Sequence, residues 1–440
     1  MDLLLAATLL ALLLAGVPVV FALAGSAFAV AGIGWALGLF DPFLFRALPG
    51  RVLGVAESDT LIAIPLFVLM GTVLERSGLA ADLVRASTHA LRGAPGGMPV
   101  AVTLVGLVLA AATGVVGASV VALGLIALPP MLAAGVPPAR ATGTVAAAGT
   151  LGQIVPPAIV LVVLADQIAA AYQLAQTRRG GFAADTVTVG DLFAGALVPA
   201  LLLAGTYVAW HMARGGGAAA QVKLPERPGL ALAAPLLLVV AVLGSILGGL
   251  ASVSEAASLG ALGAIALAAT RLPTVLRPAL LEAGRLTGII FAIVIGASVF
   301  SLVFRGLGGD ARIQTWLSTL PGGTWSALTA VLLLVFLLGF ILEFVEITVV
   351  VVPLVAPVLL ADPAVPPVWL GVLLAMVLQT SFLTPPLGVS LFYLRSVMPP
   401  DVPTGALYRG VWPFVALQAL VTLAVLAVPT LATALPATLR

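Results

Sequence analysis

ATGVVGAS, residues Ala112 to Ser119, lies in the middle of a long apolar run in which no residue from Gly93 to Ala139 carries an ionisable side chain. A membrane-spanning helix needs roughly 20 apolar residues, so the run is long enough for two. The quoted stretch is small, flexible and weakly polar, which breaks a helix without bringing it to the surface. We therefore predict that the chain turns back here at membrane depth.

A second break is predicted at GTLGQIVPPA, Gly149 to Ala158, inside another run without ionisable residues. Pro156 and Pro157 remove two backbone donors, and the glycines loosen the turn before them. Non-helical backbone at membrane depth is tolerated only where it is buried in protein or lines a watery cavity. Two such breaks close in sequence predict a binding site that is built from main chain.

The composition identifies the class of protein. The chain is 62% hydrophobic and 8% charged, whereas a soluble chain carries about 25% charged residues. It contains no cysteine, no Walker A sequence and no G-x-S-x-G motif, and His89 and His211 are isolated. These features exclude disulfides, ATP hydrolysis, a serine-hydrolase elbow and a histidine metal site. We expect a polytopic membrane protein that is not an enzyme and needs no cofactor.

The glycine- and proline-rich segment Arg214 to Gly229 divides the chain nearly in half. We predict the following organisation: a first half, 1–213, with a hairpin at about 99–130 and a broken helix at about 141–166; a linker, 214–229; and a second half, 230–440, with a hairpin at about 325–360 and a broken helix at about 367–396.

The two halves resemble each other around their proline pairs. When GTLGQIVPPAIVL (149–161) is set over LQTSFLTPPLGVS (378–390), Pro156-Pro157 superpose on Pro385-Pro386. In each half an interrupted apolar run precedes the proline pair. Repeats with broken helices at matching positions indicate a secondary transporter with a midplane site.

Elsewhere the hydropathy gives simpler expectations. Residues 3–24 and 27–45 predict one long span, or two packed through GSAFAVAGIG (25–34). Residues 166–191 predict a surface loop with Asp166 as a solvated cap, Arg271 to Arg285 an arginine-bearing segment between two spans, and Val411 to Ala434 the last span.

Hydroxyl groups lie beside both breaks, on Thr113, Ser119, Ser381 and Thr384. Half-helix ends with hydroxyls bind carboxylates and hard cations such as sodium, although small residues also serve simply to pack helices together. Glu343 and Glu346 interrupt an apolar run. An acid within the membrane indicates an ion or proton path; the alternative is a hairpin tip that reaches the interface.

Three further polar residues near the breaks have two interpretations each. Gln153 and Gln379 precede the proline pairs, and either could line a polar cavity or bond a neighbouring helix. Arg395 follows the second break and could hold a substrate carboxylate or snorkel to the interface.

These stretches together resemble a known family. The chain is similar to the large membrane subunit of tripartite ATP-independent periplasmic (TRAP) transporters, the DctM type. The resemblance covers essentially the whole chain and is carried by these segments: IPLFVLMGTVLERSGLA (64–80), AATGVVGASVVALGLIALPPMLAAG (111–135), ATGTVAAAGTLGQIVPPAIVLVVLADQ (141–167), GFILEFVEITVVVVPLVAPV (339–358) and LQTSFLTPPLGVSLFYLRSV (378–397).

The resemblance implies an all-α elevator with two repeats, each with a re-entrant hairpin and a broken helix, in the bacterial inner membrane. It implies sodium-driven uptake of an organic acid, with a periplasmic binding protein and a small four-helix membrane subunit as partners. By position, the implied sodium sites are Thr113, Gly114, Gly152, Val155 and Pro156, and then Ser381, Thr384 and Leu387 with the tip at 339–346. We assign the substrate contacts to Ser119, Gln153, Pro157, Gln379, Pro385, Pro386 and Arg395.

Two other functions are kept open. One is a stand-alone sodium/carboxylate symporter that takes its substrate directly from solution, which the absence of neighbouring genes for the two partners would favour. The other is a purely structural membrane subunit, in which a bulky residue at Thr113 or Thr384 would leave uptake intact.

Overall fold

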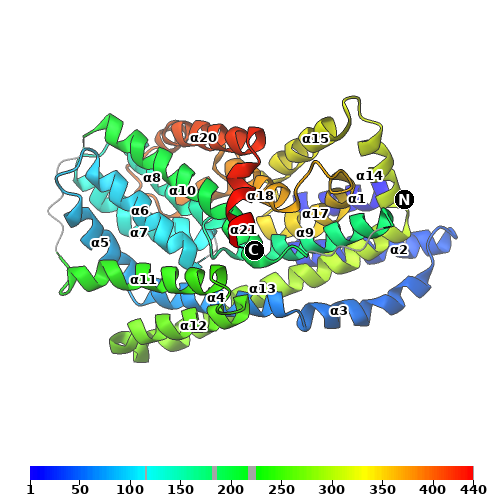
Figure 1. Ribbon diagram of the computed structural model, residues 1–440, viewed down its shortest axis with the longest axis horizontal. Helices are drawn as coiled ribbons and strands as arrows, with labels where there is room; N and C mark the ends of the chain where they lie inside the picture. Colours follow the sequence, from blue (N-terminus) through cyan, green and yellow to red (C-terminus); the bar gives the residue numbers. More distant parts are fainter. Residues whose placement is uncertain (114–115, 181–185, 217–223, 440) are drawn as a thin grey trace.

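The computed structural model describes residues 1–113, 116–180, 186–216 and 224–439, and within these parts every regular element is a helix (Figure 1). Seven of the described helices are long and apolar enough to cross a membrane; the count is up to eight if the bent pair Pro42–Ala56 and Asp59–Arg76 is one span. Helices satisfy their own backbone hydrogen bonds, as lipid requires. The chain is therefore an all-helical, multi-span membrane protein.

The first half of the chain runs from α1 to α10. Its elements are α1 (Asp2–Leu14), α2 (Val19–Ala36), η1 (Pro42–Ala47), α3 (Leu48–Ala56), α4 (Asp59–Arg76), α5 (Leu79–Ala90), α6 (Gly97–Thr113), α7 (Val116–Ala133), α8 (Pro138–Thr150), η2 (Leu151–Gln153), α9 (Ile159–Arg178) and α10 (Val189–Arg214).

The second half runs from α11 to α21. Its elements are α11 (Pro228–Leu247), α12 (Val253–Leu267), η3 (Ala269–Arg271), α13 (Leu272–Gly306), α14 (Gly309–Ser318), α15 (Gly323–Leu338), α16 (Phe344–Glu346), the π-helical turn η4 (Ile347–Val351), α17 (Val352–Leu359), α18 (Pro367–Leu383), α19 (Val389–Val397), α20 (Thr404–Ala427) and α21 (Thr430–Leu439).

Local sequence fixes where several of these helices begin. At the start of α10 the Thr188 hydroxyl accepts from the Asp191 amide at 3.1 Å, and the Asp191 carboxylate accepts from the Thr188 amide at 2.9 Å. Ser252 and Glu255 form the same reciprocal pair at the start of α12. Such capping boxes satisfy amide groups that the first turn of a helix leaves unpaired, so each helix has a defined first residue.

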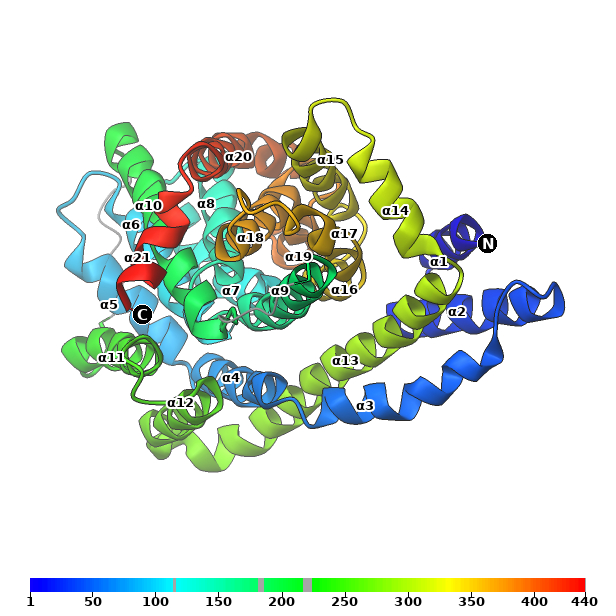
Figure 2. The same cartoon turned by 45° about the vertical axis from the view of Figure 1, so that its right-hand side comes forward.

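An elongated layer of helices runs along one side of the molecule (Figure 2). Its axis is α13, a helix of 35 residues that packs along α2 and α4, and α4 also packs against α12. A Cβ at Gly296 would lie 3.2 Å from the Val20 carbonyl oxygen. The missing side chain therefore allows α13 to approach α2 closely, as small residues do between membrane helices.

A compact bundle lies beside this layer. It contains the two hairpins, α6–α7 and α15–α17, and the two interrupted helices, α8–α9 and α18–α19. In the first half α6 packs against α7, and in the second half α15 packs against η4 and α17. The halves are interleaved: α7 packs against α19, and α17 packs against α9. Each hairpin therefore contacts an interrupted helix from the other half of the chain.

The tightest contact in the bundle joins α8 to α20 through Gly143 and Gly410. A Cβ built on either glycine would overlap the backbone carbonyl of the facing helix, Gly410 in one case and Ala139 in the other. The two backbones therefore touch directly, which no larger residue permits. This contact joins the first interrupted helix to the last long helix.

Two expectations for the first half were wrong. The N-terminal region forms two helices, but they separate at Gly16, which has a φ of 80°, and Pro18, not within 25–34. Asp166 does not cap a span, because α9 continues to Arg178. The residues after Asp166 are mainly alanine and glutamine, which are good helix formers, so a polar residue alone does not end the helix.

The second half also differs from expectation in three places. The segment from Arg271 to Arg285 does not separate two spans, because most of it belongs to the continuous α13. The last span ends at Ala427, and the chain then forms the separate helix α21. The predicted linker starts one residue too early, since Arg214 still belongs to α10; residues 217–223 lie outside the described parts.

Candidate functional site

The first break separates α8 and η2 from α9 at residues 154–158, around the Pro156–Pro157 peptide bond, which is cis. All five of these residues are buried. The predicted sodium ligands Gly152, Val155 and Pro156 therefore lie in a protein-enclosed segment of main chain. Gly149 faces the first hairpin, because a Cβ there would lie 2.9 Å from Val120 Cα. Of the remaining predicted ligands, Thr113 ends α6 and Gly114 lies outside the described residues.

Two buried glutamines lie in the interrupted helices, Gln153 in η2 and Gln379 in α18. Gln153 is 0% exposed and Gln379 is 1% exposed, and among the described residues neither side-chain amide has a hydrogen-bond partner. A buried polar group without a partner costs about 1–3 kcal/mol. Such a group calls for an explanation, and water or a bound polar species supplies one.

The second break is held in shape by hydroxyl groups. Ser390, in the first turn of α19, donates to the Phe382 carbonyl oxygen at 2.6 Å, and Thr384 donates to the Thr380 carbonyl oxygen at 2.6 Å. The Pro385–Pro386 peptide bond is cis. Unlike the first break, this one is partly open: Leu387 is 47% exposed and Pro386 is exposed, although Thr384 is buried.

Ser381 joins the second break to the tip of the second hairpin. Its hydroxyl donates to the Phe336 carbonyl oxygen at 2.6 Å, in the last turn of α15. A Cβ at Gly339 would lie 2.6 Å from Ser381 Oγ, so only glycine fits there. The structure thus brings the predicted ligand Ser381 against the tip segment 339–346.

Glu343 and Glu346 form the start of the second arm of that hairpin. They make a reciprocal capping box, in which the Glu346 carboxylate accepts from the Glu343 amide at 2.6 Å. Glu346 is buried, whereas Glu343 is exposed. Both acids therefore have a structural role at a helix start, whatever further role they have.

A cavity of about 510 Å³ lies between the elongated layer and the bundle. One wall comes from α4 and α13, and the other from α7, α18, α19 and the second hairpin. Figure 2 shows α4 and α13 side by side on one flank of the bundle. The described lining residues are Thr72, Glu75, Arg76, Val116, Gly117, Ala118, Val121, Glu282, Leu286, Ile289, Glu343, Phe344, Phe382, Val389 and Tyr393.

Tyr393 is the point in this cavity where the two hairpins meet. Its hydroxyl donates to the Glu343 carboxylate at 2.7 Å. Its ring lies against Gly117 at the start of α7, where a Cβ would be 2.8 Å from Tyr393 Cζ. One side chain on α19 therefore contacts the first hairpin with its ring and the second hairpin with its hydroxyl group.

The predicted site residues are distributed unevenly around this cavity. Of the described ones, Glu343 lines it directly, while Ser119 is buried in α7. Pro157, Pro385 and Pro386 lie in the two breaks, and the cavity lining includes none of them. The lining also lacks Gln153 in η2 and Gln379 in α18, and Arg395 is exposed near the end of α19. The sequence reasoning missed Arg76, Glu75, Glu282 and Tyr393. The charged segment that begins at Glu75, directly after an apolar run, is the signal in the sequence for Glu75 and Arg76.

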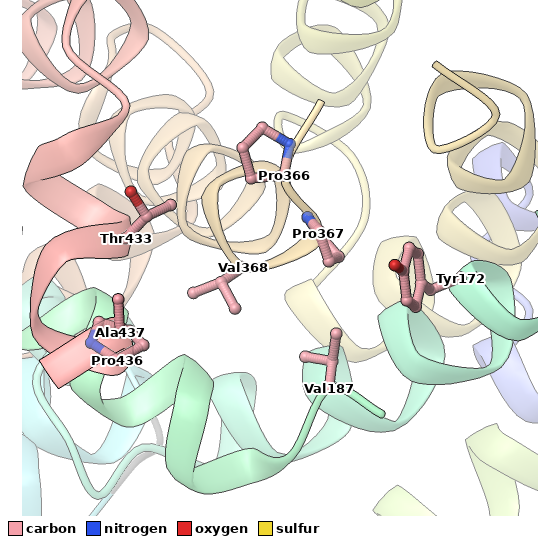
Figure 3. Close-up of a pocket in the computed structure, with 8 residues that line it drawn as sticks. All are labelled: Tyr172, Val187, Pro366, Pro367, Val368, Thr433, Pro436 and Ala437. Atoms are coloured by element: carbon pink, nitrogen blue, oxygen red, sulfur yellow. The ribbon is translucent and has the colours of Figure 1, made fainter. Parts of the chain in front are cut away.

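A second pocket, of about 260 Å³, has a different character (Figure 3). Its labelled side chains come from α9, the start of α18 and α21, and the nearby Val187. They include Tyr172, Pro366, Pro367 and Pro436 and carry no charge. Because an organic anion needs a charged or strongly polar partner, the described part of this pocket offers it little.

Comparison with known proteins gives the same family over almost the whole chain. Residues 6–431 match the family model described as "Tripartite ATP-independent periplasmic transporter, DctM component". The C4-dicarboxylate TRAP transporter large permease protein DctM of Pseudomonas aeruginosa is 30% identical over 412 residues, which cover 90% of this chain and 91% of that protein.

Two further comparisons bear on partners and fold. The isethionate TRAP transporter permease protein DctMQ of Oleidesulfovibrio alaskensis is 26% identical over 86% of this chain but only 58% of that longer protein. The solved structure of the YdaH transporter of Alcanivorax borkumensis is similar with a TM-score of 0.61 at 17% identity, and 88% of each chain is covered. That likeness concerns the fold alone.

Proposed function

The chain belongs to the family of the DctM component of tripartite ATP-independent periplasmic transporters, and on that premise we propose that it is the large permease subunit of a sodium-coupled system that imports an organic acid. The family assignment made from the sequence is confirmed, and a transporter subunit is not an enzyme. The sodium coupling, the organic acid and the partners are the proposal.

The observation that carries the proposal is that the hairpin of each half contacts the interrupted helix of the other half. Each half has a hairpin followed by an interrupted helix with a Pro-Pro pair, and α7 contacts α19 while α17 contacts α9. This order supports two repeats that enclose one central site. Discontinuous helices expose helix ends and carbonyl groups, which bind anions and cations at the midplane of secondary transporters.

The proposed sodium sites are the two breaks. Sodium is a hard cation, and hard cations take oxygen ligands from main-chain carbonyls and hydroxyls. At the second break the Ser381 hydroxyl lies next to the hairpin tip, and the Thr384 hydroxyl donates to the Thr380 carbonyl oxygen in its own helix. We propose that both hydroxyls bind an ion with the Leu387 main chain. At the first break we propose Gly152, Val155 and Pro156, with Thr113 and Gly114.

The proposed movement is that of an elevator. The cavity has one wall on α4 and α13 and the other on the bundle that holds both breaks. A substrate between two such bodies changes sides when one slides along the other, which is one form of rigid-body alternating access. In this proposal the bundle moves and the elongated layer stays fixed.

The proposed partners are a small membrane subunit and a periplasmic binding protein. The name DctMQ joins the large component to a second one in a relative that extends well beyond the matched length. The family description, tripartite and periplasmic, fits a system of three components. We propose the organic acid reaches the cavity only through the binding protein.

The experiment is uptake into proteoliposomes that contain this chain and its small subunit, with the binding protein outside. Radiolabelled succinate, lactate and isethionate are offered with an inward sodium gradient, an equal potassium gradient, or ATP and no gradient. We expect accumulation of one acid with sodium alone and only when the binding protein is present. Accumulation driven by ATP without a gradient, or of none of the three acids, would refute the proposal.

A further inference from the structure

We propose that Arg76 is the residue that binds the acidic group of the transported substrate, an inference that rests on the proposed function. Arg76 is the last residue of α4 and lines the 510 Å³ cavity. Among the described residues of that lining it is the only cation, beside the carboxylates of Glu75, Glu282 and Glu343. An anion that enters this cavity therefore has one charged partner of opposite sign.

The state of Arg76 in the structure suits this role. Its only ion pair among the described residues is with Glu282, at 3.5 Å between Nη2 and Oε2, and the two side chains are 43% and 36% exposed. An exposed pair of this kind contributes about 0–1 kcal/mol. A guanidinium has five donors in a planar fork that matches a carboxylate in a bidentate manner. Arg76 is therefore charged, accessible and weakly held.

The opposite wall defines how the substrate lies. Glu343 and Tyr393 form a hydrogen-bonded pair there, so this wall presents a carboxylate and an aromatic ring. A second negative charge placed against it would be repelled. Glu75 and Glu282 lie on the wall of α4 and α13, but that wall also holds Arg76, the only cation among the described lining residues. The acidic group of the substrate therefore faces Arg76 on α4, and its uncharged part faces α19 and the second hairpin.

The position of Arg76 also gives it a role in release. It belongs to α4, in the layer that stays fixed in the proposed movement, whereas Tyr393 belongs to the bundle that moves. The contact with Arg76 exists only while the bundle lies beside it. A ligand shifts an equilibrium only through its different affinity for the two states, and Arg76 supplies such a difference.

The test compares Arg76→Gln, Arg76→Lys and Glu282→Gln in the same proteoliposomes, with the acid of the panel that the wild type accumulates. Arg178→Gln is the matched control, because Arg178 pairs with Asp310 at 3.7 Å with exposures of 38% and 36% and lies outside the cavity. Reconstituted amounts and unfolding temperatures are measured for each variant to verify folding.

If Arg76 binds substrate, Arg76→Gln raises the half-saturating substrate concentration roughly tenfold, in line with the loss of one charge-assisted pair. Arg76→Lys gives an intermediate value because lysine cannot form the bidentate contact. Glu282→Gln leaves that concentration unchanged or lowers it, because it removes the competing acid. The dependence on sodium stays the same in all three.

The different effects of Arg76→Gln and Glu282→Gln on the half-saturating substrate concentration distinguish substrate binding from a purely structural role of Arg76. If Arg76 only stabilises the fold through Glu282, both Arg76→Gln and Glu282→Gln raise the half-saturating concentration by similar factors, and the inference is overturned. It is also overturned if Arg76→Gln behaves like Arg178→Gln. Failure of the wild type to accumulate any of the three acids overturns the proposed function and the inference with it.

Discussion

Replacing Tyr393 by phenylalanine should remove the hydrogen bond between α19 and the second hairpin while leaving the shape of the cavity unchanged. The change removes the hydroxyl that donates to Glu343 at 2.7 Å but keeps the ring against Gly117. A hydrogen bond to a charged group contributes about 1.5–3 kcal/mol. Glu343 is exposed, so solvent competes with this bond, and we expect a contribution below that range, of about 1 kcal/mol.

The measurement is a double-mutant cycle of Tyr393→Phe and Glu343→Gln. Uptake of the transported acid is measured in proteoliposomes, and the unfolding temperature in detergent. A coupling of about 1 kcal/mol corresponds to about a fivefold interaction between the two changes in half-saturating concentration. Tyr172→Phe removes the hydroxyl of a tyrosine in the separate pocket of Figure 3 and should change neither quantity.

The reasoning is refuted if the effects of the two substitutions simply add. Additivity would mean that the Tyr393 hydroxyl and the Glu343 carboxylate act independently, so that the second hairpin is not held to α19 through this bond. A companion variant, Gly117→Ala, tests the other contact of the same side chain. Its new Cβ would lie 2.8 Å from Tyr393 Cζ, and overpacking of this kind costs about 1–3 kcal/mol.

The remaining predictions concern other contacts. Ser381→Ala should raise the sodium concentration for half-maximal uptake severalfold while changing the dependence on substrate less; equal changes in both would count against a sodium ligand. Gly143→Leu should separate α8 from α20 at Gly410 and lower the unfolding temperature more than Gly205→Leu, since the structure places no atom within 4 Å of a Cβ at Gly205. The Thr324 hydroxyl donates to the Asp362 carboxylate at 2.5 Å and lowers the pKa of Asp362. The ionised carboxylate therefore stabilises the fold above the ordinary aspartate pKa of about 4 and loses this effect as pH falls. The unfolding temperatures of wild type and Asp362→Asn should converge in acid, and a constant difference between them would contradict this.

The positions of the two helix breaks could be predicted from the sequence because they depend on local chemistry. Two consecutive prolines remove donors whatever their surroundings, so helices end before Pro156-Pro157 and Pro385-Pro386 in the structure as well. The family could also be identified from the same stretches, and the matching family model confirms it. The sodium ligands drawn from that resemblance stay predictions.

The cavity was not accessible from the sequence because it depends on contacts between distant segments. Arg76 and Glu282 lie far apart along the chain, as do Gly117 and Tyr393, and only the packing of α4 on α13 and of α7 on α19 brings them together. In the sequence Arg76 only begins a charged segment after an apolar run, a pattern that is also typical of a residue at the membrane surface. The ends of α9 and α13 were missed because hydropathy measures the lipid core, whereas a helix with good propensity continues beyond it.

The interleaving of the halves has a consequence for how the protein is made. During synthesis α7 emerges long before α19, and α9 long before α17, so the first half enters the bilayer while its later neighbours have yet to be translated. In a fragment that ends in the linker, the faces of α7 and α9 that pack against α19 and α17 would have no partner helices. Maturation therefore waits for the C-terminal helices, and truncation near Val389 should yield a product that quality-control proteases remove.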